Sequence, residues 1–375
     1  MDKTLELNKI CQIYNIPSHY RAPIYQLIDN SFDSDYYFGF SKDGIKEMNL
    51  NLLKGTIYRV SYNYFLGCYY LGGIAFLDVR KYNSIIAVGE IRNISIWILA
   101  IRMFLFHKTK KLYFWSHGMY GKENVIKRMI IKLFYRLPRG GVFLYGYYAR
   151  ELLIQQGISK NKLHVIHNSL DYNKHLEIRS KLSDTDIYLK HFGNNRDTLI
   201  FIGRLTKVKR IDLLLKALAL LKSKGLIYNL TIVGQGTEFD FLRNLVAELD
   251  IVSQVWFYGE SYDEYINAQL LYSASLCVSP GNVGLTAIHA LTFGCPVLTH
   301  NDFRWQMPEF EAIKPGVTGD LYIANNIQSL AERIQAWLNI DVPRENIRQA
   351  CYNEIDLCWN PSYQLNIIKQ TLNGE

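Results

Sequence analysis

The sequence predicts an α/β protein with two domains, each built around a parallel β-sheet. Its 375 residues are the length of two or three domains. Hydrophobic residues make up 49% of the chain and charged residues 20%, a composition that supplies a core for each domain and excludes a disordered chain. Short apolar runs alternate with helical patterns along most of the chain, as they do in βαβ units.

In the second half, the predicted strands are apolar throughout rather than alternately apolar and polar. This pattern is typical of strands whose two faces are both covered by helices. The predicted strands are Thr198–Gly203, Leu230–Gly234, Val255–Gly259, Leu276–Ser279 and Pro296–His300. The predicted helices are Arg210–Lys224, Phe239–Leu249, Asp263–Tyr272, Leu285–Phe293 and Ile327–Leu338.

The first half follows the same alternation less regularly, and a polar stretch separates the two halves. The predicted strands are Tyr36–Phe40, Ile85–Gly89, Leu112–Ser116, Val142–Tyr145 and Lys162–Ile166, and the predicted helices are Ile94–Phe106, Asn124–Leu137 and Ala149–Gln156. We therefore expect a Rossmann-like first domain at residues 1–171, a linker at 172–197 and a Rossmann-like second domain at 198–358.

Several classes of chemistry have no motif in this chain. The six cysteines form no CxxC pair and have no histidine cluster beside them, which disfavours zinc sites and thioredoxin-like chemistry. We expect these cysteines to be reduced and mostly buried. The turn Gly234-Gln-Gly236 follows a predicted strand but lacks the third glycine of a dinucleotide-binding motif. No Walker A, HExxH or GxSxG sequence occurs.

No segment has the pattern of a secretory signal or a membrane span. Residues 1–12 contain no apolar stretch and no cleavage site. Residues 60–77 and 265–301 are uncharged, but tyrosines, glycines and prolines interrupt them, and a spanning helix needs about 20 mostly apolar residues. We therefore expect a cytoplasmic protein.

The positive charge of the chain is concentrated in one block. Residues 101–150 contain eleven Lys and Arg residues and one acid, Glu123, whereas the whole chain carries a net charge of +8. Within this block, the predicted helix Asn124–Leu137 has an apolar face that consists of Ile126, Met129, Ile130, Leu133 and Leu137. The basic residues Lys127, Arg128, Lys132 and Arg136 lie away from that face.

Two interpretations of this helix are open. An ordinary surface helix would pack its apolar face on the core and leave its basic residues in water. A helix that rests on an anionic membrane would gain about 1 kcal/mol for each basic residue near the surface. A nucleic acid is disfavoured as the partner, since no base-stacking aromatic residues are interleaved with the charge.

Two cations mark the end of the first strand of the second domain. Arg204 follows Gly203 directly, and Lys209 lies five residues later, before a predicted helix. In open α/β sheets, ligands bind at the carboxyl ends of the strands. Two solvated charges at a helix start would be the ordinary explanation, but cations oppose the helix dipole there, so an anion such as a diphosphate would relieve them.

A second anion-binding feature follows a later strand. The segment from Ser279 to His289 contains a glycine-rich turn and opens a short helix. Free N–H groups at Val283–Thr286 would point toward an anion, as they do at other helix starts. The alternative is a tight turn that needs glycine for its shape alone.

Three segments, taken in order, resemble the carboxyl-terminal domain of retaining family 4 glycosyltransferases with the GT-B fold. These segments are Gly203-Arg204-Leu205 with Lys209, the stretch from Ser279 to Val297, and Gln306-Met-Pro-Glu309 followed by Pro315–Gly319. The resemblance covers residues 198–323 and extends weakly to 163–171. It implies two Rossmann-like domains with a cleft between them and a helix at 359–375 that returns to the first domain.

The resemblance also implies roles for particular residues. Arg204 and Lys209 would stabilise the negative charge on a leaving diphosphate, which makes a metal ion unnecessary. The donor-binding residues would be Gly203, Asn282, Val283, Gly284, Leu285, Thr286, His289 and Glu309, with Glu309 in a supporting position. Gly281 and His289 stand where the family typically carries two glutamates. Asn282 or a backbone amide would therefore contact the donor sugar, and His289 would contact the ribose.

The first domain contributes a histidine and an amino-terminal segment. His117 ends the predicted strand before it and resembles the family's histidine near the donor sugar, although a lone histidine at a strand end is often structural. The segment Tyr20-Arg21-Ala22-Pro23 is expected on the acceptor side.

These observations predict a glycosyltransferase that moves a sugar from a nucleotide-sugar donor to a saccharide acceptor, with retention of configuration. The acceptor is expected to be lipid-linked, in capsule or O-antigen assembly, and the protein to lie peripherally on the inner face of the cytoplasmic membrane. No metal or other cofactor and no nucleic acid partner is expected. The alternatives are a sugar-nucleotide epimerase of the same fold and a catalytically silent saccharide-binding subunit.

Overall fold

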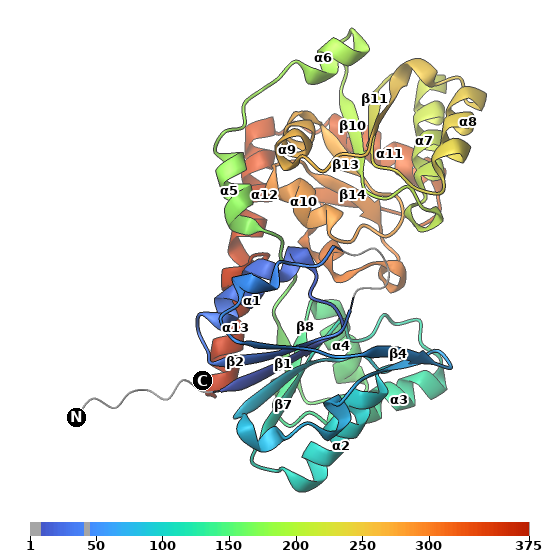
Figure 1. The fold of residues 1–375 in the computed structure, drawn as a ribbon. Coiled ribbons are helices and arrows are strands. Elements are labelled where there is room, and N and C mark those ends of the chain that lie inside the picture. Colours follow the sequence, from blue (N-terminus) through green and yellow to red (C-terminus); the bar gives the residue numbers. More distant parts are fainter. Residues whose placement is uncertain (1–8, 41–45, 375) are drawn as a thin grey trace. The chain divides into compact units, whose positions relative to one another are not determined.

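The structure, a computed structural model, describes residues 9–40 and 46–374, and the first eight residues, which belong to the segment tested for a secretory signal, lie outside this range. The chain forms two compact units. One consists of residues 1–171 together with 360–375, and the other of residues 172–359 (Figure 1). Each unit contains a parallel sheet with helices, which confirms the predicted α/β class with two Rossmann-like domains.

The first unit is built on a parallel sheet that has seven strands among the described residues, in the order β3-β2-β1-β6-β7-β8-β9. The strands are β1 (Ile10–Tyr14), β2 (Ser34–Phe38), β3 (Thr56–Arg59), β6 (Ser84–Val88), β7 (Lys111–Ser116), β8 (Gly141–Leu144) and β9 (Leu163–Val165). β1 lies inside the sheet and is buried along its whole length. No strand was predicted there.

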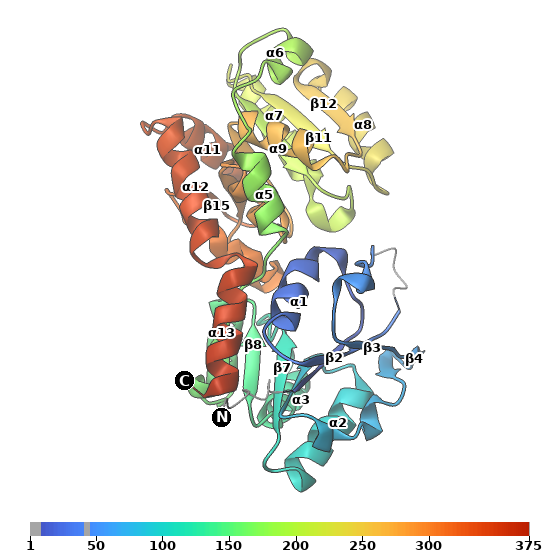
Figure 2. The same cartoon turned by 60° about the vertical axis from the view of Figure 1, so that its left-hand side comes forward.

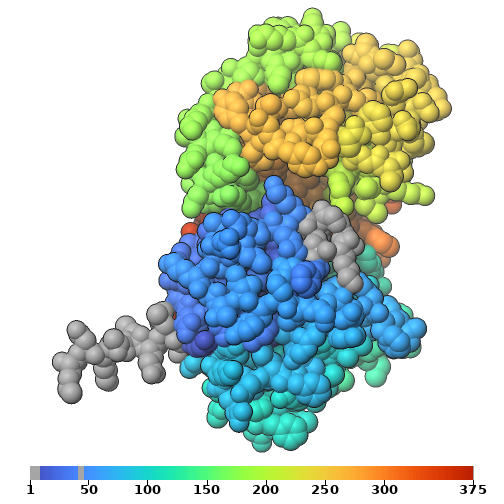
Figure 3. All heavy atoms as spheres, in the orientation of Figure 1, coloured from blue at the N-terminus to red at the C-terminus, as the bar shows by residue number. Residues whose placement is uncertain are grey.

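Helices cover this sheet, and a short antiparallel hairpin extends from it. The helices are α1 (Ala22–Asp29), α2 (Ile94–Phe106), α3 (Val125–Arg136), α4 (Tyr147–Gln155) and α13 (Pro361–Asn373). The hairpin consists of β4 (Tyr62–Phe65) and β5 (Cys68–Leu71) and projects from the unit (Figures 1 and 3). The carboxyl-terminal α13 packs beside α1, as both ribbon views show (Figures 1 and 2).

The second unit contains a six-stranded parallel sheet within the described range, in the order β12-β11-β10-β13-β14-β15. The strands are β10 (Thr198–Ile202), β11 (Asn229–Val233), β12 (Val255–Gly259), β13 (Leu276–Val278), β14 (Val297–His300) and β15 (Gly319–Tyr322). In chain order this is 3-2-1-4-5-6, the strand order of nucleotide-binding Rossmann sheets. The order reverses between β10 and β13, and ligands bind at such a reversal, outside the carboxyl ends of the strands.

The helices of the second unit are α5 (Tyr172–Arg179), α6 (Ile187–Phe192), α7 (Ile211–Ser223), α8 (Phe239–Glu248), α9 (Glu264–Ser273), α10 (Thr286–Thr292), α11 (Ile327–Leu338) and α12 (Arg344–Cys358). The expected linker at 172–197 thus contains two helices and belongs to this unit. The sequence of this segment did not indicate a helix, because α5 is mostly polar and has no apolar stripe. α5 is instead fixed by ion pairs, including one of 2.8 Å between Arg179 and Asp356 of α12.

Two further expectations can be compared with the structure. All six cysteines lie within the described residues, and each is free, with four of them buried. None of the described helices is both long enough and apolar enough to cross a membrane.

Candidate functional site

The first candidate segment is the loop that joins β10 to α7. Gly203 has a φ of +145°, which favours glycine because L side chains rarely adopt it. The N–H of Leu205 donates to the carbonyl of Gln235 at 2.9 Å, and the N–H of Glu238 donates to the carbonyl of Leu205 at 3.0 Å. A Cβ at Gly234 would lie 2.0 Å from the Gly203 carbonyl oxygen. The glycine turn after β11 therefore lets this loop pass close by and fixes its backbone.

The two candidate cations of this loop, Arg204 and Lys209, lie beyond the carboxyl end of β10. Arg204 is exposed and Lys209 is half-buried. The Lys209 ammonium donates to the main-chain oxygen of Asn282 at 2.5 Å, so it reaches the loop after β13. Burial lowers the pKa of Lys209, the carboxylate of Glu309 opposes this shift, and the charge of Arg204 adds to it. Glu309 is only 2% exposed, so the carboxylate that raises the pKa of Lys209 is buried.

The second candidate segment, between β13 and α10, differs from the expectation at Val283. The N–H of Val283 donates to Oε1 of Gln306 at 2.9 Å, and Val283 is fully buried. Gln306 is held in turn by a bond of 2.8 Å from its Nε2 to Oγ1 of Thr299. The expectation of a free N–H at Val283 is therefore wrong, because a side chain distant in sequence already accepts its proton.

The next three residues fit the expectation better. The structure assigns no acceptor to the N–H groups of Gly284, Leu285 and Thr286 within residues 9–40 and 46–374. Oγ1 of Thr286 donates to the carbonyl of Ile202 at 3.2 Å, which ties the start of α10 to the end of β10. The Asn282 side chain, expected at the donor sugar, donates to the carbonyl of Trp305 at 3.3 Å.

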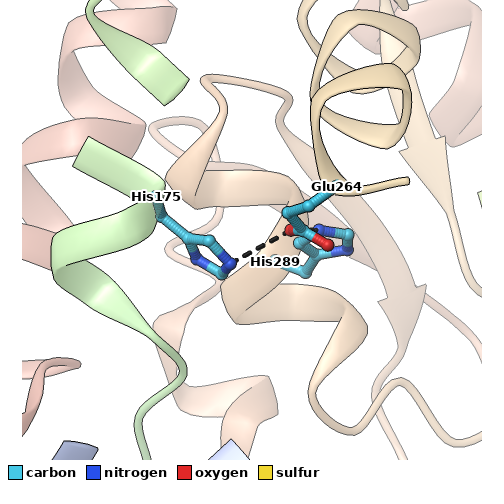
Figure 4. A group of neighbouring side chains, drawn as sticks. All are labelled: His175, Glu264 and His289. Carbon is cyan, nitrogen blue, oxygen red and sulfur yellow. Dashed lines mark hydrogen bonds and ion pairs between the residues drawn. The ribbon is translucent and has the colours of Figure 1, made fainter. Parts of the chain in front are cut away.

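His289 lies in a cluster that the sequence did not indicate. Its Nε2 is 2.6 Å from Oε1 of Glu264, and Nε2 of His175 is 3.0 Å from the same oxygen (Figure 4). The three residues come from α10, α9 and α5. Burial raises the pKa of Glu264, but the hydrogen bonds from the two imidazoles outweigh it and hold the pKa well below its ordinary value. The ligand-type atoms of all three lie within 4.8 Å of one another, a spacing that a metal ion could also use.

In the first unit, His117 follows β7 and lies beside an aromatic ring and a cation. Its ring centroid is 4.7 Å from that of Tyr145, whose hydroxyl accepts a hydrogen bond from Arg21. Burial lowers the pKa of His117 to about 4, and Arg21 contributes to this shift. His117 is therefore neutral at pH 7, and the structure brings it together with Arg21 from the segment expected on the acceptor side.

The basic helix α3 presents its apolar stripe to solvent. Ile126 is 70% exposed, Met129 67% and Leu133 59%, while Lys127, Arg128 and Arg136 are exposed and Lys132 is half-buried. The residues that α3 buries are Ile131, Phe134 and Tyr135. The interpretation in which the predicted apolar face packs on the core is therefore wrong, because a different stripe of the same helix does so.

The only acid of the basic block is not on its surface. Glu123 is 5% exposed, and its two carboxylate oxygens accept the N–H groups of Tyr120 and Gly121, both at 2.8 Å. This carboxylate shapes the loop between β7 and α3. The exposed charges of residues 101–150 are therefore positive.

Comparisons with known proteins agree with this arrangement. Residues 187–354 match the family described as Glycosyl transferases group 1. An uncharacterized glycosyltransferase of Haemophilus influenzae is 30% identical over 146 residues, which are 38% of this chain and 39% of that protein. An uncharacterized 41.2 kDa protein in the cps region of Klebsiella pneumoniae is 27% identical over 180 residues, 47% of this chain and 46% of that protein. Each alignment thus spans less than half of the relative.

Solved structures resemble the chain over nearly its whole length. HepE from Anabaena in complex with UDP has a TM-score of 0.73 at 18% identity, over 98% of this chain and 99% of that chain. The apo form of the lipopolysaccharide outer core galactosyltransferase WaaB has a TM-score of 0.71 at 15% identity, over 98% and 99%.

The fold is the GT-B fold that these solved structures share. The match to the glycosyl transferases group 1 family covers most of the second unit. The resemblance to glycosyltransferases inferred from the sequence is confirmed for this part of the chain, whereas membership of family 4 and retention of configuration stay predictions.

Proposed function

We propose that this protein transfers a sugar from a nucleotide-sugar donor to a saccharide acceptor during the synthesis of a bacterial surface polysaccharide of the capsule or O-antigen type. The family of residues 187–354 supports the transfer reaction. The Klebsiella pneumoniae relative from a cps region supports the capsule context. We also propose that transfer proceeds with retention of configuration.

The observation that carries this proposal is the pair of cations at the sheet reversal. Arg204 and Lys209 lie beyond β10, and Lys209 reaches across to the loop that precedes α10. When a nucleotide sugar breaks at its anomeric carbon, negative charge develops on the diphosphate that leaves. Fixed cations at that point stabilise this charge more than that of the bound donor, which is how they lower the barrier.

The same pair makes a metal ion dispensable for the reaction that we propose. Lys209 is fixed before the donor binds, because its ammonium is already hydrogen-bonded and Glu309 lies near it. Preorganised charges of this kind need no rearrangement during the reaction. Since HepE was solved with UDP and with UDP-glucose, a UDP-sugar is the first donor to test.

His117 is the residue of the first unit that we propose to act at the donor sugar. Its depressed pKa keeps the imidazole neutral at pH 7, so one ring nitrogen can donate and the other accept a hydrogen bond. Nδ1 is buried and has no partner among the described residues, so the hydrogen-bonding capacity of this nitrogen is unused.

We further propose that α3 rests on anionic lipid, at the inner face of the cytoplasmic membrane, and brings the enzyme to a lipid-linked acceptor. Ile126, Met129 and Leu133 are exposed without a partner from the core, and Lys127, Arg128, Lys132 and Arg136 supply positive charge on the same helix. Exposed apolar groups flanked by cations are the pattern of interfacial helices.

The decisive experiment for the reaction measures release of the nucleoside diphosphate from nucleotide sugars, with and without lipid-linked saccharides. The proposal predicts release that depends on the acceptor, together with a product one sugar larger. An epimerase would convert the donor without an acceptor, and a silent binding subunit would release nothing. Either result would contradict the proposed function.

A further inference from the structure

A carboxylate held by two imidazoles lies in the second unit. Glu264 is the first residue of α9. Oε1 of its side chain lies 3.0 Å from Nε2 of His175 and 2.6 Å from Nε2 of His289. Figure 4 shows the two rings, from α5 and α10, directed at this one carboxylate. Three helices that are separate in sequence thus meet at a single side chain.

The carboxylate of Glu264 is ionised and still has capacity to bind. The two imidazoles hold its pKa low against the opposing effect of burial. An ionised carboxylate offers about four acceptor positions, and the imidazoles use only those of Oε1. In the described part of the chain, no hydrogen bond is assigned to Oε2, and the side chain is 24% exposed. Glu264 can therefore accept hydrogen bonds from a ligand in solution.

Its place in the fold brings this carboxylate close to the proposed diphosphate site. α9 and α10 follow parallel strands, so both begin at the carboxyl edge of the sheet. His289 is about one helical turn after Thr286, whose hydroxyl is bonded to the last residue of β10. Glu264, which contacts the side chain of His289, therefore lies at the same edge of the sheet as Gly203 and Arg204.

We infer that Glu264 binds the ribose hydroxyls of the donor nucleotide and that His175 and His289 are positioning residues that hold its carboxylate. The inference rests on the proposed function. A ribose is bonded directly to the diphosphate, so its hydroxyls fall next to the phosphate site. Two vicinal hydroxyls are a pair of donors, and a fixed carboxylate is a matched acceptor with charge-assisted bonds. The resemblance implied that His289 contacts the ribose; in this inference Glu264 makes that contact and His289 positions Glu264.

The same three residues also have the composition of a metal site, but one observation disfavours it. Nδ1 of His175 is buried and has no hydrogen-bond partner among the described residues. A metal ion on Nε2 would force the ring proton onto Nδ1, where it would be a buried donor without an acceptor. In the neutral tautomer that donates from Nε2 to Glu264, the proton is on Nε2 and no buried donor is left at Nδ1.

The test compares UDP with 2′-deoxy-UDP by calorimetric titration of the full chain, in buffer with and without EDTA. Hydrogen bonds to charged groups predict that the wild type prefers UDP by about tenfold or more. Glu264→Gln should reduce this preference to within about twofold, and His175→Ala should reduce it in part. Glu248→Gln is the matched control, since Glu248 is exposed at the far end of α8 and should leave the preference unchanged.

The possible results distinguish a failure of the proposed function from a failure of the ribose assignment. A wild type that binds no nucleotide contradicts the proposed function itself. A wild type that binds UDP, but whose preference survives in Glu264→Gln, overturns the inference alone. A preference that EDTA removes would indicate a metal site and also overturn it. If Glu264→Gln does not fold, Glu264→Asp keeps the charge on a shorter side chain and must lose the preference instead.

Discussion

A Cβ atom on Gly281 would lie 2.0 Å from the carbonyl oxygen of Val208, closer than two such atoms can approach. The N–H of Gly281 donates to the carbonyl of Lys209 at 3.0 Å, so the chain passes here directly against the 3₁₀ turn η6 (Lys207–Lys209). The resembled family typically carries a glutamate at this position. In this protein the glycine lets the loop after β13 hold the turn that ends in Lys209.

This contact predicts that Gly281 is required for stability and that restoring a glutamate does not help. Gly281→Ala and Gly281→Glu should each lower the free energy of unfolding by about 1–3 kcal/mol, because the backbone at Val208 must move. Urea denaturation measures this loss. Asn282→Ala is the neighbouring control, whose side chain makes one bond of 3.3 Å, and it should cost less. Equal unfolding midpoints for Gly281→Ala and the wild type would refute the close contact.

The paired cations predict a loss of turnover. Arg204→Ala or Lys209→Ala should lower kcat by roughly 10²–10³, the usual effect of removing one charge-stabilising donor. Lys207→Ala is the control, since Lys207 is exposed on the same loop. Initial rates at saturating donor measure the effect, and thermal unfolding confirms that each variant is folded. If both variants retain wild-type rates, the assignment of the diphosphate site is wrong.

The buried His117 predicts a dependence of stability on pH. Its pKa is about 4 in the folded protein and 6.5 ordinarily, so the unfolded chain binds the proton more tightly. This residue's contribution to stability is complete above about pH 6.5 and falls by up to about 3 kcal/mol toward pH 4. His117→Gln should therefore flatten the pH dependence of the unfolding free energy, whereas His19→Gln, at an exposed position, should not. Parallel profiles for wild type and His117→Gln would show that the pKa of this imidazole is not lowered in the folded protein.

The exposed stripe of α3 predicts binding to anionic vesicles. Changing Lys127, Arg128 and Lys132 to glutamate should abolish co-sedimentation and reduce transfer to a lipid-linked acceptor more than to a short soluble analogue. Wild-type binding should weaken at high salt, because the Debye length falls from about 10 Å at 0.1 M to about 3 Å at 1 M.

The control for this experiment makes the same charge change in the second unit, at Lys190, Lys216 and Lys224. That variant should still sediment with the vesicles. If the α3 variant also sediments normally at low salt, the membrane proposal fails.

Five of the six described strands of the second sheet, all but β15, were predictable from local sequence alone. Strands β10 and β13 are buried at every position, and all of their residues except Thr198 are apolar, so the sequence shows them directly. β1 was missed because Gln12, fully buried at its centre, interrupts the apolar run and is satisfied by Ser34 and Tyr14 only in the folded protein. α12 was missed because its sequence is mostly polar.

The candidate site was predictable only where residues near in sequence act together. Gly203, Arg204 and Lys209 form a local motif, and their position after a strand fixes their place. The Glu264 carboxylate could not be found in this way, because its partners His175 and His289 come from two other helices. An acid in the first turn of a helix is also ordinary, so the sequence around Glu264 gives no signal. The hydrogen bond from the N–H of Val283 to Gln306 could not be predicted either, because the two residues are far apart in sequence.

Whether Arg204 and Lys209 bind the donor diphosphate is tested by a thermal-shift screen of the wild type and an Arg204→Ala, Lys209→Ala double variant against UDP-, GDP-, CMP- and dTDP-sugars. A ligand at 100 times its Kd stabilises the folded state by about 2.7 kcal/mol, enough to raise the unfolding midpoint clearly. We predict that one nucleotide class stabilises the wild type and fails to stabilise the double variant. A wild type that responds to none of these donors, or a double variant that responds equally, would contradict it.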